Sequence, residues 1–171
     1  FFFMKAQVSI IMGSTSDWPV MQKTADFLNE MQIPFEVNAL SAHRTPEQVE
    51  KFATNAKDNG IKVIIAAAGM AAHLPGVISS LTPLPVIGVP IKASLDGLDA
   101  LLAIVQMPPG IPVATVGINA SLNAGILAAQ IIGAGDEAIF NKTVEYKENL
   151  KVKIAKANDD LSAHKFEYRT N

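Results

Sequence analysis

Short apolar runs and polar interruptions alternate along the chain. Five runs are dense in Val, Ile and Ala, at residues 6–12, 35–40, 61–67, 84–90 and 112–116. The run at 6–12 shows little alternation between apolar and polar positions, which is typical of a strand buried on both faces of a sheet. The pattern therefore predicts five short strands.

The segments between these runs carry apolar residues three and four positions apart, as one face of a helix does. Trp18, Met21, Ala25 and Leu28 show this spacing clearly. Further helices are predicted at residues 46–60, directly after the loop at 68–76, at 96–107 and at 119–132. Strand and helix thus alternate five times, which predicts an α/β fold with a parallel sheet covered by helices on both faces.

The last 36 residues differ from the rest in charge, because they hold fourteen of the thirty charged residues. Ile139, Leu150, Ile154 and Leu161 lie on one helical stripe within them. We expect an amphipathic helix over 136–163 that packs on the body or on a neighbouring subunit. No repeat or long linker divides the chain, so we expect 1–171 to be a single domain. Met4 is the expected natural start, and 1–3 are set apart from the fold.

Composition excludes several classes of function. A net charge of −2 speaks against a broad nucleic-acid-binding surface. The absence of cysteine excludes disulfides, thiolate zinc sites and cysteine nucleophiles, and it suits a reducing, cytoplasmic location. Residues 113–135 are long enough to span a membrane, but polar residues and glycines interrupt them, so we expect a buried helix and strand and no membrane association. That much apolar sequence in a small domain suggests burial between subunits.

Three polar loops follow the first three predicted strands. They are "GSTSD" at 13–17, "SAHRTP" at 41–46 and "AGMAAHLPG" at 68–76. Ligands of parallel α/β folds bind at the carboxyl ends of the strands. The three loops are therefore expected to meet in one crevice.

The first loop suits a phosphate group. Ser14 and Ser16 offer hydroxyls beside the free amides of a helix start, Gly13 allows close backbone approach, and Asp17 can accept hydrogen bonds from ribose hydroxyls. A plain helix cap by Ser16 or Asp17, with Pro19 in the first turn, explains the same residues. Neither glycine-rich nucleotide motif occurs, which argues against an NTPase and a typical dinucleotide enzyme.

The second loop contains Ser41, His43 and Arg44. Arg44 is the only arginine before Arg169, and a guanidinium at a strand end suits bidentate phosphate binding. Histidine changes protonation near neutral pH, which makes His43 the candidate proton carrier. The alternative is a capping loop, since "TPEQ" at 45–48 has the pattern of a capping box. Such a cap leaves the other three side chains unexplained, which favours a phosphorylated small molecule as ligand.

The third loop contributes small residues and a second histidine, namely Gly69, Met70, Ala71, Ala72 and His73. Its amides suit a carboxylate, and its small side chains leave room for a small group. His73 is equally explained as a packed histidine that caps a helix. The histidines lack a helical i, i+4 partner and a carboxylate cluster, so no metal is expected, and the absence of G-x-S-x-G speaks against a serine hydrolase.

Several stretches, taken in order, resemble one known family. They are "IMGSTSDW", "SAHRTP", "AAHLPG", "LPVIGVP", "AIVQMPPGIPVATV" and "NAGILAAQI". Over about Val8 to Ile132 the chain resembles the N5-carboxyaminoimidazole ribonucleotide mutases of microbial purine biosynthesis. The resemblance implies a flavodoxin-like three-layer αβα sandwich, a homo-octamer, no cofactor, and a ribonucleotide substrate whose carboxylate moves from the exocyclic nitrogen to ring carbon 4.

The resemblance also implies roles for individual residues. Ser14, Ser41 and Arg44 would hold the phosphate, Ser16 would shape that loop, and Asp17 would bind the ribose hydroxyls. These roles agree with the chemistry of the first two loops.

For catalysis, the resemblance implies that His43 protonates the exocyclic nitrogen as carbon dioxide leaves and later takes the proton from carbon 4. The loop from Gly69 to His73 would cradle the carboxylate or carbon dioxide. In the family this loop usually reads "AGAGGAAH", whereas Ala67 and Met70 replace two glycines here. If those positions have positive φ, Ala67 or Met70 would be strained, and Met70 would narrow the pocket.

Two rival functions are considered. One is a carboxylase that acts on aminoimidazole ribonucleotide and free carbon dioxide, although "SAHRTP" with "AAHLPG" favours the mutase. The other is a nucleotide-binding protein without catalysis, which the fold permits. His43 discriminates against the binder, since binding alone has little use for a titratable group between Ser41 and Arg44.

Overall fold

A five-stranded parallel sheet forms the centre of the molecule. The computed structural model describes residues 4–171, so the expectation for 1–3 lies outside the described residues. The strands are β1 (Val8–Met12), β2 (Phe35–Ala39), β3 (Val63–Gly69), β4 (Val86–Ile91) and β5 (Ala114–Thr115). Their order is β2-β1-β3-β4-β5, with every neighbouring pair parallel. This is the flavodoxin-like order, which confirms the predicted fold class.

Helices follow the strands as predicted. They are α1 (Trp18–Glu30), α2 (Pro46–Asn55), α3 (Leu74–Leu81), α4 (Leu98–Val105), α5 (Ser121–Gly133) and α6 (Glu137–Ser162), with 3-10 turns η1 (Thr15–Asp17) and η2 (Leu95–Gly97). The prediction of one continuous helix over 96–107 is wrong at its start. Asp96 and Gly97 have φ values of 55° and 87°, so the α-helix begins only at Leu98.

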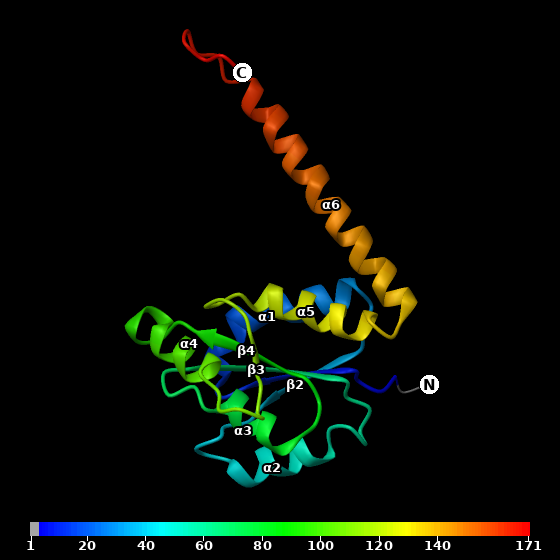
Figure 1. Ribbon diagram of the computed structural model, residues 1–171, viewed down its shortest axis with the longest axis vertical. Coiled ribbons are helices and arrows are strands. Elements are labelled where there is room, and N and C mark those ends of the chain that lie inside the picture. The colour runs from blue at the N-terminus through cyan, green and yellow to red at the C-terminus, as the bar shows by residue number, and fades with distance from the viewer. Residues whose placement is uncertain (1–3) are drawn as a thin grey trace.

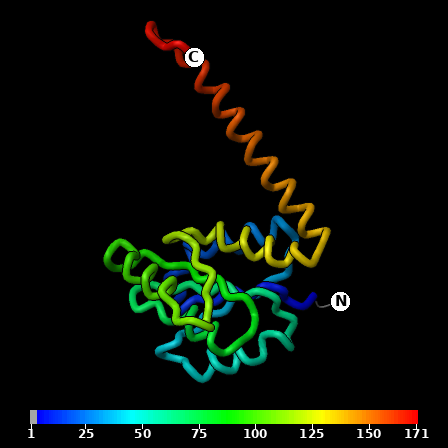
Figure 2. Tube along the Cα trace, viewed as in Figure 1, coloured from blue at the N-terminus to red at the C-terminus, as the bar shows by residue number. Residues whose placement is uncertain are grey.

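The sheet separates two apolar layers (Figure 1). Successive side chains of a strand point to opposite faces, so Ile10 and Ile65 pack against α1, α5 and the start of α6. Ile11 and Ile64 face the other way and pack against α2, α3 and α4. Figure 2 shows the same layering in the chain trace, with the trace of α6 leaving the body. The chain is thus a three-layer αβα sandwich.

The capping box predicted at 45–48 does not form. Thr45 occupies the cap position of α2, but its side chain makes no hydrogen bond to that helix. Its hydroxyl instead accepts from the Ser41 amide at 2.9 Å and donates to the Ser41 carbonyl at 3.2 Å. Thr45 therefore closes the loop that carries His43 and Arg44.

Only the first part of α6 packs on the body. Ile139 and Thr143 are buried there, and the rings of Tyr146 and Phe27 meet edge to face with centroids 5.1 Å apart. Every residue over 147–168 is exposed. The helix therefore leads away from the sandwich (Figure 1).

Among residues 4–171, no helix combines the length and the apolarity needed to cross a membrane. The longest helix, α6, carries charged side chains along its whole length.

Candidate active site

A pocket of about 360 Å³ lies at the carboxyl end of the sheet, and all three predicted loops contribute to it. This volume falls within the usual range for small-molecule sites. The residues that line it are Gly13, Ser14, Ser16, Asp17, Ser41, Ala42, His43, Arg44, Ala68, Gly69, Met70, Ala71, Leu74 and Ala93. The loops after β1, β2, β3 and β4 therefore form one site.

Ser14, and not Ser16 or Asp17, caps the helical start in the first loop. Its hydroxyl accepts hydrogen bonds from the amide and the hydroxyl of Ser16, at 3.3 and 2.9 Å. Asp17 occupies the cap position of α1, but its side chain makes no capping hydrogen bond to that helix. Pro19 lies in the first turn as predicted. Burial raises the pKa of Asp17, and a hydrogen bond from Ser16 lowers it in part. A half-buried carboxyl beside two hydroxyls favours a hydrogen-bonding ligand.

Arg44 joins the first loop to the second. Its Nη2 donates to the Gly13 carbonyl at 2.6 Å, and its Nε donates to the Ser41 hydroxyl at 3.4 Å. The Ser41 hydroxyl also accepts from the Arg44 amide at 3.2 Å. These bonds hold the guanidinium in the pocket wall, and its Nη1 group is still available to an anion.

The two site histidines contact one another. Nε2 of His43 and Nδ1 of His73 lie 2.8 Å apart, and the rings are nearly perpendicular at 84°. In this hydrogen bond one of the two nitrogens donates and the other accepts. Of the two histidines, only His43 lines the pocket.

The third loop divides into two parts. Gly69, Met70 and Ala71 line the pocket, whereas Ala72 is 1% exposed and belongs to the core below α3. His73 occupies the cap position of α3 but makes no side-chain cap bond, so its bond to His43 replaces the capping role considered for it. The pocket thus lacks direct contact with two of the predicted site residues.

Of Ala67 and Met70, the two residues that replace glycines of the family loop, one has a strained backbone. Met70 has a φ of 55°, in the left-handed region that favours glycine, and its side chain is 60% exposed. Ala67 lies within β3 and is fully buried in the sheet. The strain considered for Ala67 is therefore absent.

Sequence reasoning missed the apolar part of the lining. Ala42, Ala68, Leu74 and Ala93 carry no group that signals chemistry. Ala93 follows β4 at the carboxyl end of the sheet, where ligands of parallel α/β folds bind. Its position after a strand was therefore the one signal that could have predicted its place in the pocket. These residues give the pocket a partly apolar wall beside the polar loops.

In the part of the chain that the structure describes, no three His, Asp or Glu residues lie together as a metal site would require. The arrangement offers a fixed cation, a half-buried carboxyl, hydroxyl donors and an imidazole pair. Such a set suits an anionic small molecule that exchanges a proton with the protein.

Comparison with known proteins identifies a matching family model and related sequences. The family model described as AIR carboxylase matches residues 7–153. The chain is 56% identical over 149 residues to N5-carboxyaminoimidazole ribonucleotide mutase of Thermotoga maritima, covering 86% of this chain and 87% of that protein. It is 49% identical over 161 residues to the chloroplastic phosphoribosylaminoimidazole carboxylase of Vigna aconitifolia, covering 94% of this chain and 29% of that protein.

A solved structure agrees with the fold. The crystal structure of Treponema denticola PurE superposes with a TM-score of 0.81 at 30% identity, over 90% of this chain and 97% of that one. The family match spans most of the sandwich, the four pocket loops and the first part of α6. The chain belongs to the AIR carboxylase family.

Proposed function

We propose that the chain converts N5-carboxyaminoimidazole ribonucleotide into its 4-carboxy isomer within its own pocket. The chain is a mutase of purine biosynthesis, and curated relatives at 51–56% identity carry the name of this activity. The observation that carries the mechanism is the position of His43. It lines the pocket together with Ser41 and Arg44, and its ring lies 2.8 Å from His73 of the third loop.

The phosphate of the substrate binds to Ser14, Ser41 and Arg44. The Arg44 guanidinium is held by the Gly13 carbonyl and by the Ser41 hydroxyl, which fixes it before substrate arrives. Charge-assisted bonds between a guanidinium and a phosphate are among the stronger hydrogen bonds in proteins. This end of the pocket therefore offers the substrate strong, charge-assisted contacts.

The ribose binds at Asp17. A carboxylate accepts from the two ribose hydroxyls, while Ser16 keeps the loop in shape through its bond to Ser14. Burial raises the pKa of Asp17 because it disfavours the ionised carboxylate. Hydrogen bonds from the ribose hydroxyls of the substrate would stabilise that ionised form.

His43 carries the proton. It protonates the exocyclic nitrogen as the nitrogen–carbon bond breaks and carbon dioxide forms, and the bond's electron pair stays on that nitrogen. Carbon 4 then attacks the carbon dioxide, and His43 takes the proton that carbon 4 loses. Nδ1 of His73 lies 2.8 Å from Nε2 of His43, so a hydrogen bond holds the His43 ring in place. This bond adjusts when His43 gains or loses the transferred proton.

The carboxylate and the carbon dioxide lie against Gly69, Met70 and Ala71. The Ala72 side chain is buried below this surface, and His73 acts through His43. The proposed steps use only these groups and need no cofactor. A phosphorylated metabolite of this kind stays within the cell, which supports a cytoplasmic location.

We propose that the chain assembles with copies of itself into an octamer. Two rows of exposed apolar side chains support assembly. The first row lies on η2 and α4, where Leu95, Leu98, Leu102 and Val105 are 47–75% exposed. The second lies on α6, where Leu150, Ile154 and Leu161 are 42–72% exposed. Rows at helical spacing are typical of surfaces that another chain covers.

Two names support the carboxylase alternative, and one of them is the description of the matching family model as AIR carboxylase. The Vigna aconitifolia relative, of which this chain matches 29%, is named a carboxylase. The non-catalytic alternative has no specific observation in its favour, because a binding protein does not need the His43–His73 pair.

The test is turnover of N5-carboxyaminoimidazole ribonucleotide without added bicarbonate, with His43→Asn as the matched variant. Formation of the 4-carboxy isomer by the unsubstituted chain, and its loss in the variant, is the expected result. Activity only from aminoimidazole ribonucleotide plus bicarbonate would identify a carboxylase. Binding without turnover in either assay would identify a binding protein.

A further inference from the structure

Methionine supplies all the sulfur in this chain, which has six methionines and no cysteine. Three of the six lie in the core and are at most 5% exposed, namely Met12, Met21 and Met31. Met107 is half-buried, and its sulfur packs against Gly76, where a β-carbon would lie 3.0 Å from it. Oxidants in solution therefore reach Met4 and Met70 far more readily than the other four.

Met4 and Met70 differ in what surrounds them. Met4 is 81% exposed and lies ahead of β1, and it is not among the residues that line the pocket. Met70 is 60% exposed and belongs to the pocket wall, between Gly69 and Ala71. An oxidant that enters the pocket from solvent therefore meets one thioether in its lining, that of Met70.

The Met70 side chain is present despite a cost in free energy. Its φ of 55° lies in the left-handed region, which glycine adopts freely and other residues adopt at a cost. Glycine usually stands at this position in the family loop, so the reaction itself does not depend on a side chain at residue 70. Conformations of this kind cluster at functional sites. The thioether is therefore a feature that this chain adds to the pocket.

We propose that Met70 is a reversible oxidation site, at which a hydroperoxide converts the thioether to a sulfoxide and thereby lowers turnover. The sulfur lone pair attacks one oxygen of the peroxide, and the oxygen–oxygen bond breaks. Sulfur loses two electrons to the peroxide, and with hydrogen peroxide the second oxygen leaves as water. Two thiols of a methionine sulfoxide reductase system reverse the step and yield the thioether, a disulfide and water.

The effect on turnover rests on the proposed function, in which the carboxylate and the carbon dioxide lie against Gly69, Met70 and Ala71. Oxidation turns a flexible apolar side chain into a polar one, whose oxygen carries partial negative charge. The neighbouring glycine and alanine offer that oxygen no side-chain hydrogen-bond donor. The oxygen therefore adds bulk and repulsion where the substrate carboxylate binds, which weakens binding and slows the transfer.

The experiment combines peroxide treatment with two readouts. The unsubstituted chain, Met70→Leu and Met4→Leu are treated with hydrogen peroxide. Peptide mass spectrometry follows the gain of one oxygen at each methionine, and the turnover of each protein is compared with its own untreated value. We expect the unsubstituted chain and Met4→Leu to lose turnover severalfold in step with oxidation at residue 70. Met70→Leu should keep most of its own untreated turnover.

Repair and protection complete the test. Reductases for both sulfoxide epimers, supplied with a thiol, should restore the turnover of the oxidised unsubstituted chain. The 4-carboxy product, bound in the pocket at saturation, should slow the oxidation of Met70 and leave that of Met4 unchanged. The second readout does not depend on turnover.

Four results would overturn the inference. They are oxidation of Met70 no faster than that of Met12, an equal fractional loss of turnover in Met70→Leu, turnover that stays low after residue 70 is reduced, and oxidation of Met70 that the bound product does not slow. If the chain forms no 4-carboxy product before peroxide is added, the proposed function itself fails. The predicted loss of turnover then fails with it, while the mass spectrum still decides whether Met70 is an oxidation site.

Discussion

The pocket loops and the outer half of α6 are both exposed, but their side chains differ in kind. In the loops, polar groups bond to one another, as Arg44 does to the Gly13 carbonyl and His43 to His73. Along α6 the exposed side chains Leu150, Ile154 and Leu161 are apolar and repeat with the turn of the helix. The first arrangement suits a polar ligand of small size, and the second suits another protein chain.

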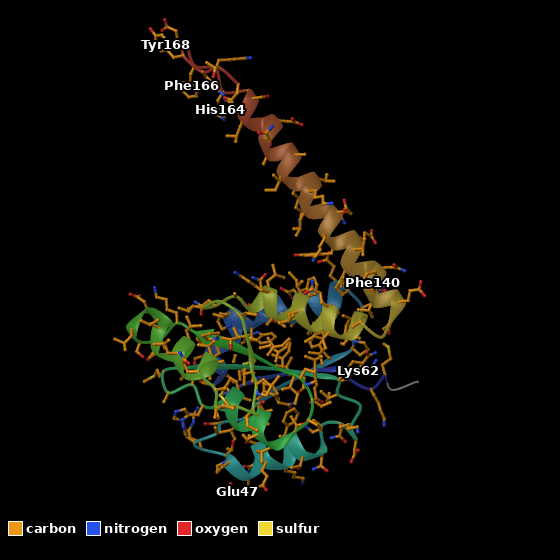
Figure 3. The ribbon with its side chains drawn as sticks, viewed as in Figure 1. Glu47, Lys62, Phe140, His164, Phe166 and Tyr168 are labelled. Carbon is orange, nitrogen blue, oxygen red and sulfur yellow. The ribbon has the colours of Figure 1, made fainter. Side chains whose placement is uncertain are left out.

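The pocket loops and the outer half of α6 also lie in different parts of the molecule. Figure 3 places Phe140 where α6 begins and His164, Phe166 and Tyr168 at the far end of the tail, away from the sandwich. The outer half of α6 leads away from the sandwich, whose loops line the pocket (Figures 1 and 3). Changes in the loops should therefore affect chemistry, and changes in the outer tail should affect assembly.

The largest expected effect is at His43. His43→Asn keeps a polar side chain of similar size but cannot carry the proton, so turnover should fall by about 10²- to 10⁴-fold. Binding of substrate should be largely kept, because the phosphate contacts are elsewhere. Steady-state kinetics with a separate binding titration would measure both, and turnover within a few-fold of the unsubstituted chain would refute the role.

Arg44 should give the next largest effect, seen in binding. Arg44→Ala removes the guanidinium that faces the phosphate, and bonds to charged groups contribute roughly 1.5–3 kcal/mol, which corresponds to about a 10- to 100-fold rise in KM. Arg169, the other arginine, bonds to the Leu161 carbonyl in the tail and gives the control Arg169→Ala. Equal changes in KM for the two variants would contradict the assignment of the phosphate site.

The apolar row of the tail should control assembly. Leu150→Glu combined with Ile154→Glu adds two negative charges to the row, and we expect these charges to prevent the proposed assembly while the sandwich stays folded. Lys156→Glu changes the net charge equally, but it lies off the row, and it should leave assembly intact. Light scattering would measure the mass, and an unchanged mass of the double variant would show that the row is not an interface.

The smallest effect concerns Asp17. Burial raises its pKa above the usual 3.8, so the folded chain holds this proton more tightly than the unfolded chain does. Its contribution to stability is therefore complete below about pH 3.8 and is lost as pH rises through the raised folded pKa.

Urea unfolding tests this sign. The unsubstituted chain should lose stability relative to Asp17→Asn as the pH rises from about 3 to about 7. A difference that grows in the opposite direction would mean that the folded state stabilises the ionised carboxyl.

Much of this molecule follows from local pattern. Buried strands such as Val8–Met12 and Val63–Gly69 are almost wholly apolar, and parallel topology brings the residues after them to one edge. Ser14, Ser41 and Arg44 could therefore be placed together before any geometry was known, although their individual roles follow from the family resemblance.

Other features depend on contacts that a pattern does not contain. Thr45 matches a capping box, yet its hydroxyl bonds to Ser41 because the loop turns back on itself. The approach of His43 to His73 joins residues thirty positions apart through their rotamers. The left-handed residues Leu95 and Asp96, with φ of 44° and 55°, delay the start of α4 although the sequence favours helix there.

The central claim is that the loops after β1, β2 and β3 hold one ribonucleotide with its base beside His43. A crystal structure of His43→Asn with N5-carboxyaminoimidazole ribonucleotide bound tests it most directly. We predict the phosphate on Ser14, Ser41 and Arg44, the ribose at Asp17, and the exocyclic nitrogen next to residue 43. A nucleotide bound elsewhere, or one with its phosphate away from Arg44, would contradict the account.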